Sequence, residues 1–143
     1  SGIKNKKINI LRDGNQKRPL LSLNELNNRY LSIDEDVFKK NNGEIFNIGN
    51  NSLNLTINDI FEMVSSSLGG KFEKNWYGDP DHRSYSVSFD KISEGIDFDA
   101  EMHAEDGARE IREALDSGHL DPNDSSAITL SWYKELIEKG EIS

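Results

Sequence analysis

The chain has 143 residues, enough for one domain with a sizeable core. Its 34% apolar and 30% charged residues are typical of a soluble protein, and its net charge of −9 argues against nucleic acid as the main partner. No apolar run approaches the roughly 18 residues of a membrane helix, and no leader-like segment opens the chain. The absence of cysteine excludes disulfides and thiolate chemistry and agrees with a cytoplasmic location.

The N-terminal segment is basic and contains two predicted strands. Residues 7–11 (KINIL) predict a short strand, residues 12–15 (RDGN) a turn, and residues 20–21 a second brief strand that ends at Ser22. The segment is either a solvated basic surface or contains a local anion site. Its basic residues are Lys4, Lys6, Lys7, Arg12, Lys17 and Arg18.

A helix start follows the second strand. Ser22, with Glu25 three residues later, has the form of a capping box, in which each side chain bonds the other residue's backbone N–H. Residues 41–43 predict the loop after this helix. The apolar face of the helix is expected to carry Leu26, Tyr30 and Ile33.

A predicted strand and a second helix come next. Residues 44–49 (EIFNIG) predict a compact strand closed by Gly49, where the backbone must turn or admit a neighbour. Residues 50–54 predict a polar loop. Thr56 and Asp59 then form a capping-box-like start. The apolar stripe of this helix comprises Ile57, Ile60, Phe61, Val64 and Leu68.

The middle of the chain changes from strand to helix period. Residues 72–77 predict a strand, residues 78–81 a loop, and the alternation of residues 84–89 (SYSVSF) a half-buried strand. Residues 90–92 begin a short helical turn, and residues 105–115 have the spacing of an amphipathic helix. The aromatic residues expected in the core are Trp76, Phe89, Phe98 and Trp132.

The chain ends with a turn at residues 121–124 and a final helix, which Ser125 or Ser126 is expected to cap. Strands alternate with about four helices, so the predicted fold class is α/β, or α+β for the piece by itself. The buried face of the last helix is expected to carry Ile128, Trp132 and Leu136.

Five motifs occur in an order that resembles their order in a known family. Residues 13–18 have the form D-G-x-Q-x-R, residues 43–49 read GEIFNIG, and Thr56 opens a helix after them. Residues 85–92 have the form Y-x-V-x-F-x-K-I and residues 105–111 the form E-D-G-x-R-E-I. In this order they resemble the C-terminal segment of extended short-chain dehydrogenase/reductases, the NAD-dependent nucleotide-sugar epimerases and dehydratases.

The chain departs from the family at two positions and lacks two of its motifs. Pro19 stands where the family usually has Asp, and residues 23–25 (LNE) stand where it has V-x-D. No tyrosine has a lysine four residues later, so the catalytic Tyr-x-x-x-Lys pair is absent, and so is the dinucleotide fingerprint G-x-x-G-x-x-G.

The resemblance therefore implies a single C-terminal, substrate-binding domain over residues 1–143, without the NAD-binding Rossmann domain. NAD is the expected cofactor of the parent enzyme, and none is expected to bind this chain alone. The chain alone is expected to be inactive, with no catalytic residue of its own. The expected partners are a nucleotide-diphosphate sugar and the missing NAD-binding half. No nucleic acid and no membrane are expected as partners.

The resemblance implies that arginines hold the diphosphate of the nucleotide sugar. Arg18 occupies the motif position whose arginine contacts the diphosphate in the family, and a guanidinium can form two parallel hydrogen bonds to phosphate. Without the resemblance, Arg18 would be interpreted as a surface arginine. Arg83 either supplies a second phosphate contact or flanks the strand that holds Tyr85; the family's usual position for that arginine falls nearer Gly78.

Two amides are further candidates. Gln16 and Asn47 can hydrogen-bond a sugar or a base edge, or can satisfy backbone groups at a turn and a strand end. A metal site has little support, because the histidines are scattered and cysteine is absent. The acidic residues around 97–106 are expected to form a solvated surface rather than an acid–base pair.

Two functional hypotheses follow. The first is the nucleotide-sugar-binding portion of an epimerase or dehydratase, and the alternative is a non-enzymatic binding or interaction module that retains the family's C-terminal fold. In the family, the strands corresponding to residues 20–23 and 44–49 join the parallel sheet of the NAD-binding domain. Without that domain they would expose an open edge, so we also predict self-association or partial disorder near the N-terminus.

Overall fold

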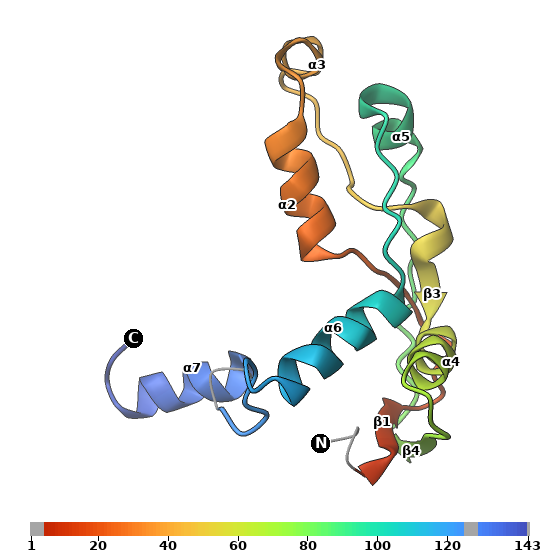
Figure 1. The fold of residues 1–143 in the computed structure, drawn as a ribbon, viewed down its shortest axis with the longest axis vertical. Helices are drawn as coiled ribbons and strands as arrows, with labels where there is room; N and C mark the ends of the chain where they lie inside the picture. Colours follow the sequence, from red (N-terminus) through yellow and green to blue (C-terminus); the bar gives the residue numbers. More distant parts are fainter. Residues whose placement is uncertain (1–4, 125–128, 143) are drawn as a thin grey trace. The chain divides into compact units, whose positions relative to one another are not determined.

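The computed structural model describes residues 5–124 and 129–142. The chain divides into two compact units, one up to Arg109 and one from Glu110 onward. Helix α6, Ala104–Asp116, is continuous across this boundary (Figure 1). The residues predicted to carry function all lie in the first unit.

Within the described residues, six α-helices and four short strands confirm the mixed α/β class. The strands are β1 (Lys7–Leu11), β2 (Lys17–Pro19), β3 (Asn54–Thr56) and β4 (Glu73–Tyr77). The helices are α2 (Leu23–Ser32), α3 (Glu35–Lys40), α4 (Ile57–Ser67), α5 (Asp90–Ile96), α6 and α7 (Thr129–Glu138), with a 3₁₀ turn η1 (Asn51–Leu53) before β3.

The strands form two separate two-stranded sheets. β1 and β4 are parallel, in register from Lys7 opposite Glu73 to Leu11 opposite Tyr77. β2 and β3 are antiparallel, with Arg18 opposite Leu55. These pairings bring the basic N-terminal segment against the middle of the chain, and Arg18 belongs to β2.

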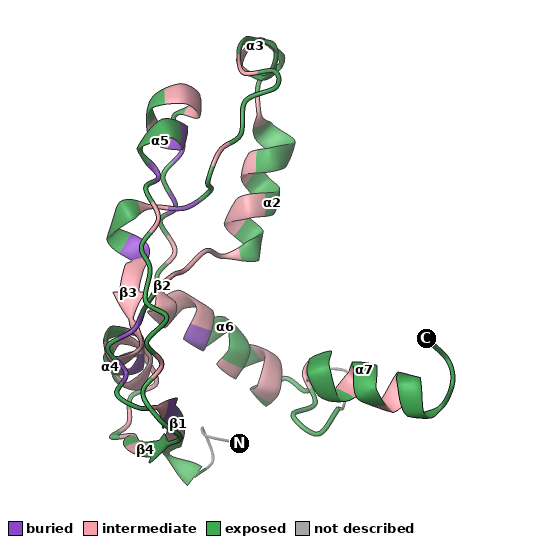
Figure 2. Ribbon diagram, turned by 180° about the vertical axis from the view of Figure 1, so that it is seen from behind, coloured by how far each residue is buried: buried purple, intermediate pink, exposed green. Residues whose placement is uncertain are grey.

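The core of the first unit gathers around η1 and α5. Leu53 is fully buried and packs with four other buried residues. Gly49 is required beside this cluster, because a Cβ there would lie 2.6 Å from the Phe89 ring. In Figure 2 buried stretches lie in α5 and in the loops beside it, whereas α2 and α3 bury no residue. The cluster comprises Leu53, Phe89, Ile92, Phe98 and Ala100.

Three predicted strands are wrong, because tertiary pairing decides them. The second strand lies at residues 17–19 rather than 20–21, since β3 offers a backbone partner there. Residues 44–49 form no strand; Lys91 Nζ binds their backbone instead, donating to the Ile45 carbonyl at 2.9 Å. Residues 84–89 also form no strand, because side chains rather than a neighbouring strand satisfy much of their backbone.

The predicted helix starts differ in outcome. The Thr56–Asp59 capping box is confirmed, with both reciprocal hydrogen bonds present. The Ser22–Glu25 box is wrong: Ser22 accepts from the Asn24 N–H, but the Glu25 carboxylate instead accepts from the backbone N–H groups of Glu101 and Met102. The two bonds measure 2.5 and 3.0 Å, so they link α2 to the segment before α6.

One helix was not predicted, and another is longer than predicted. Helix α3, capped by Asp34, was not expected, and α5 extends well beyond the predicted helical turn. Trp76 and Trp132 are not in the core: Trp76 is 39% exposed, and α7, which carries Trp132, buries none of its described residues. The predicted caps Ser125 and Ser126, together with Ile128, lie outside the described residues; the final helix itself is present as α7.

Candidate functional site

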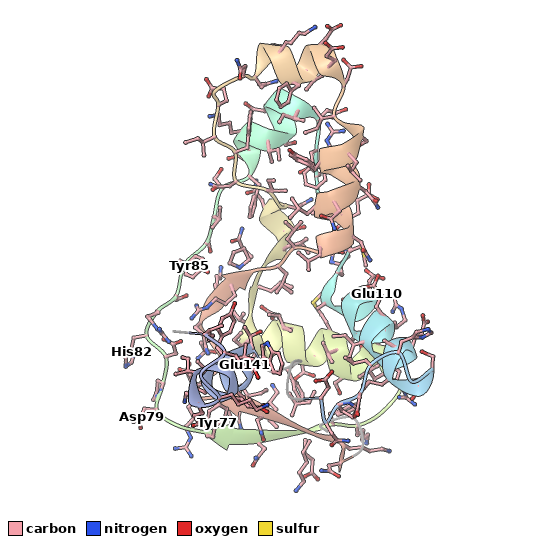
Figure 3. The ribbon with its side chains drawn as sticks, turned by 90° about the vertical axis from the view of Figure 1, so that its left-hand side faces the viewer. Tyr77, Asp79, His82, Tyr85, Glu110 and Glu141 are labelled. Carbon is pink, nitrogen blue, oxygen red and sulfur yellow. The ribbon has the colours of Figure 1, made fainter. Side chains whose placement is uncertain are left out.

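The segment after β4 returns to the start of the chain. The Asp81 N–H donates to the Arg12 carbonyl at 3.0 Å, and the Lys17 N–H donates to Ser84 Oγ at 3.0 Å. Figure 3 follows this segment from Tyr77 past Asp79 and His82 to Tyr85. It therefore places its own charged residues next to β2.

Asp81 joins the two arginines that the sequence proposed as phosphate ligands. Arg18 Nη2 lies 3.0 Å from Asp81 Oδ2, and Arg83 binds both carboxylate oxygens, with Nε 2.8 Å from Oδ1 and Nη2 3.0 Å from Oδ2. The two arginines are 65 positions apart in the chain. Charge-assisted, two-point pairing of this kind is the strongest form of the arginine–carboxylate contact.

Arg18 is held from several directions. Its Nη1 donates to the Lys17 carbonyl at 2.7 Å and to the Arg83 carbonyl at 2.5 Å. Its guanidinium carbon lies 5.2 Å from the centre of the Tyr85 ring, within cation–π distance. The side chain is only 26% exposed, so its orientation is set by the surrounding protein.

Arg83 is held on one side only. Its side chain is 84% exposed, whereas that of Asp81 is 10% exposed, and Asp81 is its hydrogen-bond partner among the described residues. A guanidinium has five N–H donors. Arg18 uses three and Arg83 two, which leaves two and three donors, five in total, without an acceptor in the described part of the chain.

The arginines keep the carboxylate charged. Hydrogen bonds from the Arg83 side chain and backbone, together with the positive charges of Arg83 and Arg18, lower the pKa of Asp81 from 3.8 to about 2. The same pairing raises the pKa of Arg83. The three side chains carry a net charge of +1, which suits an anionic ligand.

The two predicted amides form no described contact with this cluster. Gln16 is 6% exposed, and its Oε1 is buried without a partner in the described residues. Its backbone carbonyl accepts from the Ile57 N–H at 3.2 Å. Asn47 is exposed and donates to the Ser88 carbonyl at 3.4 Å. Neither forms a described hydrogen bond to Arg18, Asp81 or Arg83.

Sequence reasoning missed Asp81. An aspartate two residues before an arginine in a loop carries a usable signal, because Asp side chains often accept the backbone N–H two positions on. The Arg83 N–H does donate to Asp81 Oδ1 at 3.0 Å. Reading that turn would have placed the Arg83 side chain beside a carboxylate.

A shallow pocket of about 410 Å³ is lined by Arg12, Asp13 and Trp76. The Arg12 side chain forms no hydrogen bond or ion pair to another described residue. The pKa of Asp13 is lowered, chiefly by the hydrogen bond that it accepts from the Asn15 N–H. This pocket offers one cation, one carboxylate and one aromatic face, and it shares no lining residue with the arginine cluster.

Within residues 5–124 and 129–142, no three His, Asp or Glu side chains are grouped so as to hold a metal ion. The helices of these ranges include none with the length and apolar character to span a bilayer. No protein-family model matches the chain, and no curated protein shows significant similarity to it.

Proposed function

We propose that this chain binds the diphosphate of a nucleotide sugar through Arg18 and Arg83. In this proposal it is the substrate-binding portion of an NAD-dependent epimerase or dehydratase and is catalytically incomplete alone. The support comes from the motif order in the sequence together with one structural observation. That observation is the convergence of Arg18 and Arg83 on a single carboxylate, although they lie far apart in the chain.

The arrangement suits a diphosphate in two respects. Arginine forks match the spacing of phosphate oxygens, and two forks side by side can each take one phosphate group. Five guanidinium N–H donors still lack an acceptor in the described residues, so the cluster has unused donor capacity. Tyr85 lies against Arg18 and adds an aromatic side chain to the same surface.

NAD has no assigned place on this chain. The residues present include neither the glycine fingerprint for a dinucleotide nor a Tyr-x-x-x-Lys pair, so they do not fit the cofactor. The contribution of this chain is to hold and orient the nucleotide diphosphate while a separate NAD-binding half performs the chemistry.

Titration calorimetry with UDP-glucose and dTDP-glucose tests the proposal. Arg83→Ala removes donors from an exposed side chain and should weaken binding about tenfold or more, because hydrogen bonds to charged groups contribute about 1.5–3 kcal/mol. Arg112→Ala is the matched control, since Arg112 pairs with Asp116 on α6 and should leave the affinity unchanged. Free glucose, which lacks the diphosphate, should not bind.

Arg18 needs a gentler substitution because it also supports the Arg83 carbonyl. Arg18→Lys keeps the charge but not the fork, and it should weaken nucleotide-sugar binding while the protein remains folded by circular dichroism. If the folded wild-type chain binds neither nucleotide sugar, the proposal fails and the non-enzymatic module becomes the better explanation.

A further inference from the structure

We propose that Asp81 is an internal counterion, which the second phosphate group of a diphosphate ligand displaces from Arg83 while Arg18 stays in place. The inference rests on the proposed function and adds to it a mechanism of site opening. It assigns different roles to the two arginines. Arg18 keeps its contacts in both states, whereas the Arg83 side chain exchanges the Asp81 carboxylate for a phosphate group of the ligand.

The contacts of Arg18 explain why it stays. Two backbone carbonyls and Tyr85 hold its guanidinium in addition to Asp81, so loss of the carboxylate would leave most of these contacts intact. The two carbonyls come from β2 and from the segment after β4, which other hydrogen bonds join. Its remaining N–H groups can donate to the oxygens of a first phosphate group.

The contacts of Arg83 explain why it moves. Its exposed side chain has Asp81 as its described partner, so exchange of that partner requires only side-chain rotation. Asp81 would keep two hydrogen bonds after Arg83 leaves, from Arg18 Nη2 and from the Arg83 backbone N–H. The Asp81 carboxylate therefore keeps hydrogen-bond donors when the Arg83 side chain moves to the ligand, which lowers the free-energy cost of the exchange.

The charge state of Asp81 determines what can release Arg83 from it. Because its pKa is held at about 2, the carboxylate is ionised throughout the ordinary pH range, and protonation does not release Arg83. A competing anion must do so. A single phosphate can bind at Arg18 alone, whereas a diphosphate carries a second phosphate group that can compete with Asp81 for Arg83. The site should therefore prefer diphosphates to monophosphates.

The test compares inorganic pyrophosphate with inorganic phosphate on the full chain by titration calorimetry. Asp81→Asn removes the competing charge but retains an oxygen for the Arg83 N–H. We expect it to bind pyrophosphate roughly three- to tenfold more tightly than wild type, because the Arg83 side of the pair is exposed to solvent, which weakens the pairing that the ligand must replace. Asp116→Asn, in the exposed pair with Arg112, is the matched control and should not change the affinity.

A second measurement avoids dependence on the variant. In the wild type, the ¹H–¹⁵N signal of Arg83 Nε should shift on saturation with pyrophosphate and should move less with phosphate. An unshifted Arg83 signal at saturation would overturn the proposal. So would a folded Asp81→Asn protein that binds pyrophosphate no more tightly than wild type, because Asp81 would then organise the arginines rather than compete for them.

The outcomes separate this inference from the proposed function. If wild type binds nucleotide sugars but Asp81→Asn gains no affinity, the binding function stands and the counterion mechanism falls. If neither protein binds pyrophosphate or nucleotide sugars, both fall together.

Discussion

Asn54 and Val87 exchange two hydrogen bonds. The Asn54 amide donates to the Val87 carbonyl at 2.9 Å, and the Val87 N–H donates to Asn54 Oδ1 at 2.8 Å. Asn51 repeats part of this pattern, because its Oδ1 accepts from the Phe89 N–H at 2.9 Å. Asparagine side chains thus take the place of a neighbouring strand beside residues 87–89, in the same segment that carries Arg83 and Tyr85.

Replacement of Asn54 by Ala should weaken the fold. The Val87 backbone groups are partly buried and would lose both partners, so we expect the free energy of unfolding to fall by about 1–3 kcal/mol. Urea denaturation measures this. Asn27→Ala, at an exposed position on α2, should change stability by no more than about 0.5 kcal/mol. Equal stability of wild type and Asn54→Ala would show that the side-chain pairing is dispensable.

The Asp81 carboxyl should titrate at unusually low pH. Its pKa is about 2 in the folded chain, against about 3.9 for an unperturbed aspartate, so its ionised form favours the folded state. This stabilisation is complete above about pH 4 and is lost as the pH falls toward 2. Carbon-13 NMR of the carboxyl group follows the titration, and Arg83→Ala should move the midpoint upward. A midpoint near 4 in the wild type would contradict the pairing.

Leu53→Ala should be among the most destabilising single substitutions in the first unit. Leu53 is 0% exposed and packs against Phe89, Ile92 and Phe98. Truncation of a buried leucine costs about 2–5 kcal/mol through lost contacts and the cavity left behind. Leu31→Ala is the matched control, since Leu31 is 82% exposed on α2. Thermal unfolding should separate the two variants clearly, and similar melting temperatures would place the core elsewhere.

Self-association remains a prediction, with a changed structural basis. Residues 20–23 and 44–49 do not form the open edges that the sequence suggested. Instead, β1 and β4 make a parallel sheet of only two strands, whereas parallel sheets are normally covered on both faces. Light scattering over a concentration series should show an average mass that rises above the 16.2 kDa of the chain. A constant monomer mass would argue that these edges are protected.

Local signals predicted the elements that depend on neighbouring residues. The helix start at Thr56 is confirmed because capping depends on adjacent positions. The strand at residues 7–11 is confirmed because it also has a distant partner, β4. The strand at residues 84–89 fails because a ladder needs a distant partner, and Asn51 and Asn54 replaced it. No local pattern reveals that choice.

The candidate site was partly predictable for the same reason. Arg18 and Arg83 could be selected from motif position and side-chain chemistry, and the structure brings them to one carboxylate. The turn from Asp81 to Arg83 is local and could have been predicted, but the contact of Asp81 with Arg18 appears only when β2 lies beside the segment after β4. Gln16 and Asn47 were chosen for their chemistry alone, and their contacts lie outside this cluster.

The division of the chain provides two built-in optical reporters. Of its two tryptophans, Trp76 lies in β4 and Trp132 in α7, so each compact unit contains one indole. Replacing either by phenylalanine would leave an emission spectrum that follows a single unit. Coincident fluorescence transitions for the two proteins would mean that the units melt cooperatively, and separate transitions would mean that helix α6 joins two independently folding parts.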